Sequence, residues 1–150
     1  MKQAFIRQAK ESDVRCIAEL QRRWLGEDNV YGLMPEWHEQ IRAALGPYLL
    51  VAEAADEVVG FVSGSVRTSG GMAVIPAGES YLEVENLYVL PEFRGRGTGG
   101  GLITRLLEEA RGRGVAYALL YSAAKDIHAA LRFYERQHFR SWYVQMFREL

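Results

Sequence analysis

The sequence predicts a mixed α/β domain in which helices pack on a central sheet. In the first half, the apolar segment Tyr48–Ala54 and the segment Val58–Val66 flank a short turn, which indicates a β-hairpin. In the second half, the strand-like segments Tyr81–Leu90 and Val115–Tyr121 flank an amphipathic helix. A hairpin-rich part followed by a β-α-β part is typical of a sheet with helices against its faces.

Length and composition narrow the class of protein. The 150 residues are 49% hydrophobic, which suits a single domain over residues 1–150. The net charge is -1, so we expect neither a nucleic-acid partner nor an anionic membrane partner. A single cysteine, Cys16, excludes an internal disulfide framework, and the three histidines lack metal-ligand spacing, so no metal is expected. No apolar run approaches the ~20 residues of a membrane span and residues 1–10 lack a signal-like apolar region, so we expect a cytoplasmic protein.

Periodicity predicts the elements of the first half. Residues 4–8 alternate and predict a first strand. A helix follows with Ser12 as its N-cap, residues 27–34 form a loop, and Pro35 opens a second helix that ends at Gly46. The turn between the two hairpin strands lacks the glycine that such turns favour. The apolar stripes of the two helices comprise Val14, Ile17, Ala18, Gln21, Trp24 and Leu25, then Trp37, Ile41, Ala44 and Leu45.

The second half predicts two further helices. The first carries an apolar face and ends at Gly112 and Gly114. Apolar residues at helical spacing from Ile127 to His138 predict the last helix, and Phe139–Leu150 is expected to form one or two final strands. The predicted order is therefore β-α-α-β-β-β-α-β-α-β.

A glycine-rich turn connects the strand Tyr81–Leu90 to the following helix. Glycine destabilises a helix by about 0.8–1 kcal/mol relative to alanine, so a functional reason for this cluster is expected. Bare backbone amides at a helix N-terminus favour anions, and Arg94 and Arg96 add positive charge. The turn therefore predicts a phosphate or pyrophosphate site. Five of the 15 glycines lie within the seven positions from 95 to 101, namely Gly95, Gly97, Gly99, Gly100 and Gly101.

Two familiar phosphate-binding motifs fit this turn less well. Residues 95–100 match G-x-G-x-x-G, the dinucleotide fingerprint, but no acidic residue follows the next strand, which ends in Tyr121-Ser122-Ala123-Ala124. A P-loop is excluded because no lysine follows the glycines. A dinucleotide-binding protein remains the less favoured alternative.

The turn and its surroundings resemble one family. Arg94-x-x-Gly97-x-Gly99 is similar to the R/Q-x-x-G-x-G/A signature of the GNAT superfamily of acetyl-CoA-dependent N-acetyltransferases. The segment Leu87–Gly97 resembles the family's strand-then-loop segment, and Leu131–Arg136 resembles its later helix with a Phe-Tyr-Glu pattern. The resemblance covers essentially the whole chain. It implies a mostly antiparallel twisted sheet with helices on both faces, and transfer of acetyl from acetyl-CoA to a primary amine in a direct ternary complex.

The same resemblance implies a coenzyme A site. Amides of the glycine-rich turn would bind the pyrophosphate, and the backbone of the preceding strand, which usually carries a bulge, would bind the pantetheine arm. An independent sign of a bulge is that Leu82 and Val84 are even-numbered whereas Leu87 and Val89 are odd-numbered. Because Tyr88 is also apolar, a strand buried on both faces explains the pattern equally well. The implied coenzyme-binding residues are Leu87, Tyr88, Val89, Arg94, Gly95, Arg96, Gly97, Thr98, Gly99 and Gly100.

Three residues are candidates for proton transfer. Glu83 and Glu85 are candidate bases, because two carboxylates in one apolar strand are unusual and neighbouring carboxylates raise one pKa. The alternative is a solvent-facing pair, and the sequence does not choose between the two glutamates. By resemblance, Tyr134 is the candidate acid for the departing thiolate; a tyrosine of the core is the alternative. Ile127 stands where the family often has a coenzyme-contacting Asn, so a non-catalytic acyl-CoA-binding module is kept as a second reading.

The early helices and loops are expected to contact the acceptor. Aromatic rings beside carboxylates suit a cationic amine, whether it belongs to a small molecule, a peptide or a protein. The alternative for the two tryptophans on apolar stripes is a place in the core. Homodimers are common among similar proteins, and the oligomeric state stays open. The residues in this region are Trp24, Glu27, Asp28, Tyr31, Glu36 and Trp37.

Overall fold

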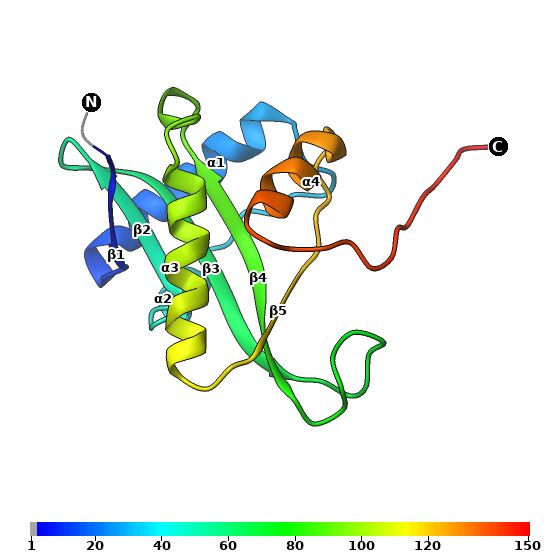
Figure 1. The fold of residues 1–150 in the computed structure, drawn as a ribbon. Helices are drawn as coiled ribbons and strands as arrows, with labels where there is room; N and C mark the ends of the chain where they lie inside the picture. The colour runs from blue at the N-terminus through cyan, green and yellow to red at the C-terminus, as the bar shows by residue number, and fades with distance from the viewer. Residues whose placement is uncertain (1–2) are drawn as a thin grey trace.

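A computed structural model describes residues 3–150 as a five-stranded sheet with helices on both of its faces (Figure 1). Two short 3-10 turns precede helices, η1 at Glu11–Asp13 and η2 at Pro91–Phe93. The remaining elements, in chain order, are β1 (Phe5–Gln8), α1 (Val14–Glu27), α2 (His38–Ala43), β2 (Leu49–Ala54), β3 (Glu57–Thr68), β4 (Ser80–Val89), α3 (Thr98–Gly112), β5 (Tyr117–Leu120) and α4 (Ile127–Arg136).

The sheet has the order β1-β2-β3-β4-β5, and its topology follows from the connections. The first four strands pair antiparallel, whereas β5 pairs parallel with β4 because α3 crosses between them. Helix α3 covers one face and α1 and α2 cover the other (Figure 1). The fold class and the mostly antiparallel sheet are confirmed. Within residues 3–150, every helix is too short or too polar to cross a membrane.

A β-bulge in β4 confirms the prediction of a phase slip between positions 84 and 87. In the pairing with β3, Asn86 lies opposite Ser63 and Val84 lies opposite Gly64, so Glu85 is the extra residue. The extra residue keeps Leu82 and Val89 on the face that packs against α3, although their numbers differ in parity.

The tyrosine that follows the bulge faces the opposite side of the sheet. The Tyr88 ring stacks on Trp24 of α1, with 5.4 Å between the ring centroids. The pattern of apolar residues in this strand therefore has both explanations that the sequence allows, namely a bulge and burial on two faces.

The prediction of one or two final strands over Phe139–Leu150 is wrong. These residues are extended, pair with no strand of the described chain and run away from the body of the molecule (Figure 1). The physical reason is that strand-like side chains form a strand only beside a free edge, and the segment leaves α4 in a direction that reaches none.

The β2–β3 hairpin offers a test of local strain. Ala54 and Glu57 pair directly, so Ala55 and Asp56 form a two-residue loop with φ angles of 51° and 63°. The first of these positions favours asparagine, because positive φ costs an ordinary residue about 1–2 kcal/mol. We expect Ala55→Asn to raise the free energy of unfolding in urea by about 0.5–1 kcal/mol. Ala55→Val should lower it, and equal shifts in both variants would contradict this account.

Candidate functional site

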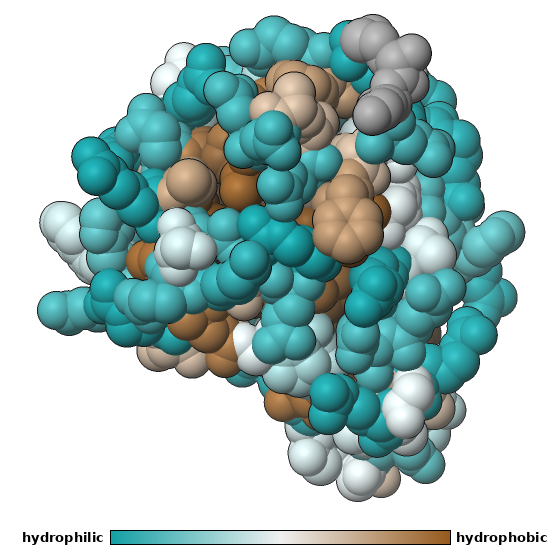
Figure 2. All heavy atoms as spheres, turned by 90° about the vertical axis from the view of Figure 1, so that its left-hand side faces the viewer, coloured by the Kyte–Doolittle hydropathy of each residue, from teal (hydrophilic) through white to brown (hydrophobic). Residues whose placement is uncertain are grey.

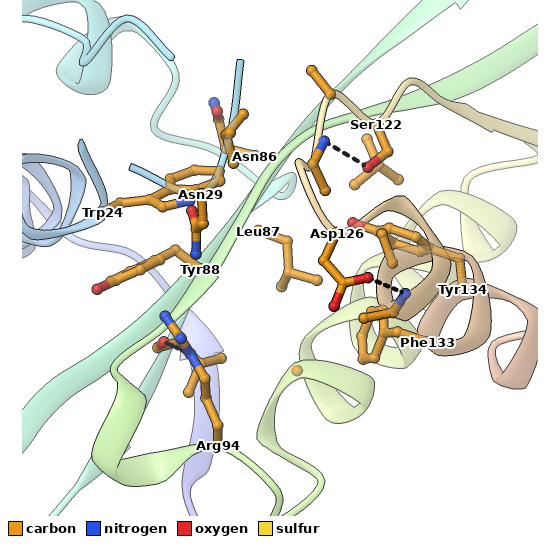
Figure 3. Close-up of a pocket in the computed structure, with 18 of the residues that line it drawn as sticks. Trp24, Asn29, Asn86, Leu87, Tyr88, Arg94, Ser122, Asp126, Phe133 and Tyr134 are labelled. Carbon is orange, nitrogen blue, oxygen red and sulfur yellow. Dashed lines mark hydrogen bonds between the residues drawn. The ribbon is translucent and has the colours of Figure 1, made fainter. Parts of the chain in front are cut away.

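A cavity of about 920 Å³ lies beside the end of β4 that follows the bulge. Side chains from α1, the loop after it and β4 line one wall, among them Trp24, Asn29 and Tyr88 (Figure 3). Asp126 and Tyr134, from α4 and the turn before it, line the opposite wall (Figure 3). The N-terminus of α3 borders the same space. The cavity therefore joins segments that are far apart in the sequence.

The glycine-rich turn presents bare backbone to this cavity. Gly95 and Gly97 have φ angles of 73° and 81°, which ordinary residues adopt only with strain. Gly97 is the N-cap of α3, no side chain caps the helix, and the Gly101 N–H makes the first helical bond, to the Gly97 carbonyl at 2.9 Å. The amides between them come before that bond and lie at a positive helix end. This end of α3 is suited to an anion.

The other three glycines serve packing. A Cβ on Gly99 would lie 3.4 Å from the Phe133 ring, and one on Gly100 would lie 3.0 Å from the Gln137 side chain. A Cβ on Gly101 would lie 2.8 Å from Ile6, closer than such atoms come. These glycines let α4 and β1 approach α3. The cluster thus has a second purpose, which is to hold one cavity wall in place.

Arg94 makes its strongest contacts within the protein. Its guanidinium donates to both carboxylate oxygens of Glu27, at 2.8 and 2.7 Å, and its Nε donates to the Val89 carbonyl at 2.8 Å. The Tyr88 hydroxyl donates to the same Glu27 carboxylate at 2.6 Å. Glu27 therefore ties the end of α1 to β4 and to the glycine-rich turn. The sequence predicts Glu27 on the acceptor side and Arg94 at the anion, whereas the structure pairs the two.

Burial and charge act in opposite directions on this cluster. Burial by itself would raise the pKa of Glu27, but hydrogen bonds from Arg94 and Tyr88 outweigh it and keep that pKa below the ordinary 4.5. Burial, together with the nearby Glu27 carboxylate, raises the pKa of Tyr88. At neutral pH the carboxylate is ionised and the phenol is neutral.

Arg96 does not join the cavity. Its guanidinium lies 5.4 Å from the centroid of the Phe93 ring, and it is absent from the residues that line the cavity. The other nine implied coenzyme-binding residues do line it.

The two candidate carboxylates occupy different places. Glu85, the bulged residue, lines the cavity and accepts a hydrogen bond from the Ser65 hydroxyl. Glu83 lies outside the lining, and its carboxylate is 2.9 Å from the Arg67 guanidinium. Arg67 is also 4.0 Å from Glu85, so one positive charge offsets both carboxylates. Of the two glutamates between which the sequence does not choose, only Glu85 therefore lines the cavity.

Tyr134 faces the cavity from α4 (Figure 3). Its ring packs edge-on against Phe133 and Phe139, with centroids 4.9 and 5.9 Å apart. Burial raises the pKa of the Tyr134 phenol, so the hydroxyl is neutral and able to donate a proton at neutral pH.

Of the six acceptor-side residues, Trp24 and Tyr31 line the cavity and the other four do not. Asp28 pairs with Lys125 at 2.9 Å. Trp37 is 79% exposed, because α2 begins at His38 and leaves Trp37 as its N-cap rather than on a buried stripe. The core alternative for Trp37 is therefore wrong, whereas Trp24 is half-buried against Tyr88.

Sequence reasoning missed several polar residues of the lining. The loop after α1 is held by the turn before α4, since the Tyr31 N–H donates to Ala123 and the Lys125 N–H donates to Asn29, each at 2.9 Å. No spacing signal joins segments almost a hundred positions apart. The polar lining residues missed in this way are Asn29, Asn86, Ser122, Asp126, Arg136 and Gln137.

Comparison with known proteins then decides the family. Residues 10–139 match the model of the acetyltransferase (GNAT) family. The chain belongs to the GNAT family. An uncharacterized N-acetyltransferase of Archaeoglobus fulgidus is 36% identical over 92 residues, which are 61% of this chain and 59% of that relative.

Solved acetyltransferases share the fold of this GNAT protein at low sequence identity. An aminoglycoside acetyltransferase from an uncultured soil metagenomic sample has a TM-score of 0.73 and 18% identity, covering 98% of this chain and 96% of its own. A predicted acetyltransferase of Clostridium acetobutylicum, solved with acetyl-CoA, has a TM-score of 0.71 and 19% identity, with 95% of each chain covered. A ribosomal-protein-alanine N-acetyltransferase of Brucella melitensis has a TM-score of 0.70 and 19% identity, covering 97% and 99%.

The Glu27 cluster generates a stability prediction. Because its hydrogen bonds to Arg94 and Tyr88 involve a charge but are partly solvated, we expect Glu27→Gln to lower the free energy of unfolding at pH 7 by about 1–2 kcal/mol. Because the pKa of Glu27 is lower in the folded protein than in the unfolded chain, the ionised carboxylate stabilises the fold at pH values above the unfolded-state pKa. This stabilisation is lost as the pH falls through the folded-state pKa. The difference between the variant and the natural protein should therefore narrow below pH 4.5.

Urea unfolding at neutral and acidic pH measures this difference. Glu92→Gln is the control, because Glu92 is an exposed carboxylate that lies 3.9 Å from Arg23 and close to the same turn. Glu92→Gln should change the free energy of unfolding little at either pH. A Glu27→Gln effect that stays constant with pH would contradict the ionic account.

Proposed function

We propose that this GNAT protein transfers the acetyl group of acetyl-CoA to a primary amine in a direct ternary complex. The observation that carries the proposal is that the uncapped N-terminus of α3 opens into the same cavity as Glu85 and Tyr134. An anion-binding helix end, a carboxylate and a neutral phenol are the groups that such a transfer requires. The acetyl-CoA bound to the Clostridium relative supports the choice of donor.

The residues present fit coenzyme A. A Cβ built on Gly95 or Gly97 would meet no atom within 4 Å, so the space beside the turn is open. The amides of Thr98, Gly99 and Gly100 would hold the pyrophosphate. When bound, acetyl-CoA supplies the activated acetyl group.

The backbone of β4 beyond the bulge would hold the pantetheine arm. Strand β5 pairs with β4 only from Tyr81 to Val84, whereas β3 pairs with β4 as far as Val89. Residues 87–89 therefore keep one edge without a strand partner, and that edge faces the cavity. Exposed N–H and C=O groups are suited to an extended ligand with amides of its own.

Glu85 is the base that we propose, because it lines the cavity and Glu83 does not. The Ser65 hydroxyl holds its carboxylate in place. Glu85 takes a proton from the acceptor ammonium, directly or through one water, so that the amine nitrogen can bond to the acetyl carbon. As the carbon–sulfur bond breaks, the Tyr134 hydroxyl gives its proton to the thiolate.

The acceptor that we propose is a cationic amine on a small molecule. Trp24 and Tyr31 provide aromatic faces at the cavity wall, and Asp126 adds a carboxylate on the opposite side. The soil relative is named as an aminoglycoside acetyltransferase, which supports this class. The Brucella relative is named for a protein substrate, so peptide amines belong in the test.

The test is an acceptor screen with detection by mass. The protein is incubated with acetyl-CoA and with amines of three kinds, namely polyamines, aminoglycosides and peptides. Addition of one acetyl group to a member of the panel supports the proposal. Only slow coenzyme hydrolysis, with no acceptor in the panel, would favour the non-catalytic module, and a thermal shift with NAD but not with acetyl-CoA would favour the dinucleotide alternative.

Tyr134→Phe removes the proposed acid and keeps the ring. We expect kcat to fall by about 10²–10³-fold, because positioned proton transfer contributes on that order. The Kd for coenzyme A, measured by calorimetry, should stay unchanged. Tyr121→Phe is the control, since Tyr121 also lines the cavity but is 64% exposed. Unchanged turnover in Tyr134→Phe would remove Tyr134 from the mechanism.

Glu85→Gln and Glu83→Gln form a matched pair on one strand. We expect Glu85→Gln to lower kcat/KM by about 10²-fold at pH 7. The loss should shrink as pH rises, because the acceptor amine then deprotonates without help. Glu83→Gln should change kcat/KM less than about fivefold, since its carboxylate pairs with Arg67 outside the cavity. A larger loss in Glu83→Gln than in Glu85→Gln would reverse the assignment.

A further inference from the structure

The bulge in β4 brings two consecutive polar side chains to one face of the sheet. A regular strand turns neighbouring residues to opposite faces, but the extra residue Glu85 breaks this alternation. Glu85 accepts a hydrogen bond from the Ser65 hydroxyl, and the Asn86 amide nitrogen donates one to the Ser63 hydroxyl at 3.1 Å. Ser63 and Ser65 are two positions apart on β3, so they share a face of that strand. The carboxylate and the amide that they hold therefore lie side by side on that face.

The hydrogen bond to Ser63 determines which end of the Asn86 amide is free. The amide nitrogen is engaged, whereas no group within residues 3–150 donates to the amide oxygen. Every fully buried side-chain nitrogen or oxygen in the same residues has a hydrogen-bond partner, so this unpartnered oxygen is accessible. Ser63 is only 7% exposed and serves as a buried anchor. An oriented acceptor oxygen is thus left free next to Glu85.

Both side chains line the cavity. Asn86 lies on the wall that carries Trp24 and Asn29, and Tyr134 lies on the opposite wall (Figure 3). The β1 end of the sheet differs, because the surface there is mostly hydrophilic, with apolar atoms in small separate patches (Figure 2). In the cavity, aromatic rings share the lining with the polar atoms. Hydrogen bonds to a charged donor are stronger where apolar groups reduce the surrounding water.

We propose that the side-chain oxygen of Asn86 binds the reacting ammonium of the acceptor together with Glu85, an assignment that rests on the proposed function because it gives a second contact to the amine that Glu85 deprotonates. A primary ammonium has three N–H donors, so it can bond to both side chains at once. Two fixed oxygens restrict the direction of the nitrogen more than one oxygen does. Asn86 is therefore a residue that orients the acceptor.

An amide suits this role because it does not titrate. The Asn86 oxygen accepts a hydrogen bond but takes no proton, so Glu85 is the only base of the pair. Once the ammonium has given a proton to Glu85, the strong hydrogen bond between opposite charges is lost. The remaining hydrogen bond to Asn86 then holds the neutral amine while its lone pair turns from Glu85 toward the acetyl carbon.

The alternative is that Asn86 only fastens the bulge to β3. Two variants of similar shape separate this alternative from the proposal. Asn86→Asp keeps an oxygen that can accept a hydrogen bond from the ammonium, and the Ser63 hydroxyl can donate to the new carboxylate. Asn86→Leu has a similar volume but no polar atom. An asparagine with a purely structural role would not separate the two variants by their affinity for an amine.

Steady-state kinetics with ethylamine as the acceptor provides the first test, because the proposal concerns the ammonium group and not the rest of the acceptor. For Asn86→Leu we expect the KM for ethylamine to rise by about 10–100-fold, since a hydrogen bond to a charged group is lost. The KM for acetyl-CoA should change by less than about threefold, because only acceptor binding is affected. Asn86→Asp should keep the KM for ethylamine at or below that of the natural protein.

Two serine variants serve as a matched pair. Ser63→Ala leaves the Asn86 amide free to rotate, so it should raise the KM for ethylamine less than Asn86→Leu does. Ser80→Ala, at the start of β4 and outside the cavity lining, should leave that KM unchanged. Urea unfolding of each variant checks that it is folded. An unchanged KM in Asn86→Leu, or an equal rise in Asn86→Leu and Asn86→Asp, would overturn the proposal.

Binding without turnover provides the second test. Ethylammonium is titrated into the full chain with coenzyme A, which has no acetyl group to transfer, and the side-chain amide of Asn86 is followed by NMR. Its resonances are identified by their loss in Asn86→Asp. We expect them to shift until the site is saturated, whereas the amide of the exposed Gln145 should not shift. An unshifted Asn86 amide would overturn the proposal.

The two tests also distinguish this proposal from the proposed function. Acetylated amine together with an unshifted Asn86 amide would overturn the role of Asn86 and leave the acetyl transfer intact. A shifted Asn86 amide with no amine of the panel acetylated would overturn the proposed function and support the ammonium site. The NMR titration decides the role of Asn86 if ethylamine reacts too slowly for a KM to be measured.

Discussion

The extra residue at Glu85 is the constraint on which the site depends. Without it, the residues after position 85 would exchange faces, and Leu87 and Val89 would turn away from α3. With it, one strand packs apolar side chains against α3 both before and after the bulge, while Tyr88 stays on the α1 face. The pairing with β5 also stops at Val84, just before the bulge. The cavity exists because β4 continues past the point where its neighbour ends.

One carboxylate joins three segments of the wall opposite α4. Glu27 accepts hydrogen bonds from Tyr88 on the strand and from Arg94 at the start of the glycine-rich turn. The end of α1, the bulged strand and the glycine-rich turn are therefore joined by one hydrogen-bonded cluster. This arrangement gives the arginine of the family signature a structural purpose in this chain, because its side chain holds the turn against α1 and β4.

The glycine cluster shows how one sequence feature meets two requirements. Gly95 and Gly97 allow left-handed backbone and leave space beside the turn, whereas the three helical glycines allow α4 and β1 to pack closely. A Cβ at Gly101 would lie 2.8 Å from the end of the Ile6 side chain, which would have to shift. Left-handed backbone in the turn and close packing along α3 both favour the absence of a side chain.

The sequence by itself determined the fold class, the order of all elements except the last and the position of the glycine-rich turn, and it predicted the phase slip that the bulge explains. Each of these rests on a local signal: hydrophobic period, phase or a run of glycines. Tertiary structure decided what depends on neighbours distant in the chain. It placed Glu85 in the cavity and Glu83 outside it, paired Arg94 with Glu27 and left Trp37 exposed. It also left residues 139–150 unpaired. A composition typical of strands favours pairing with a sheet edge, but it does not determine which edge the segment can reach.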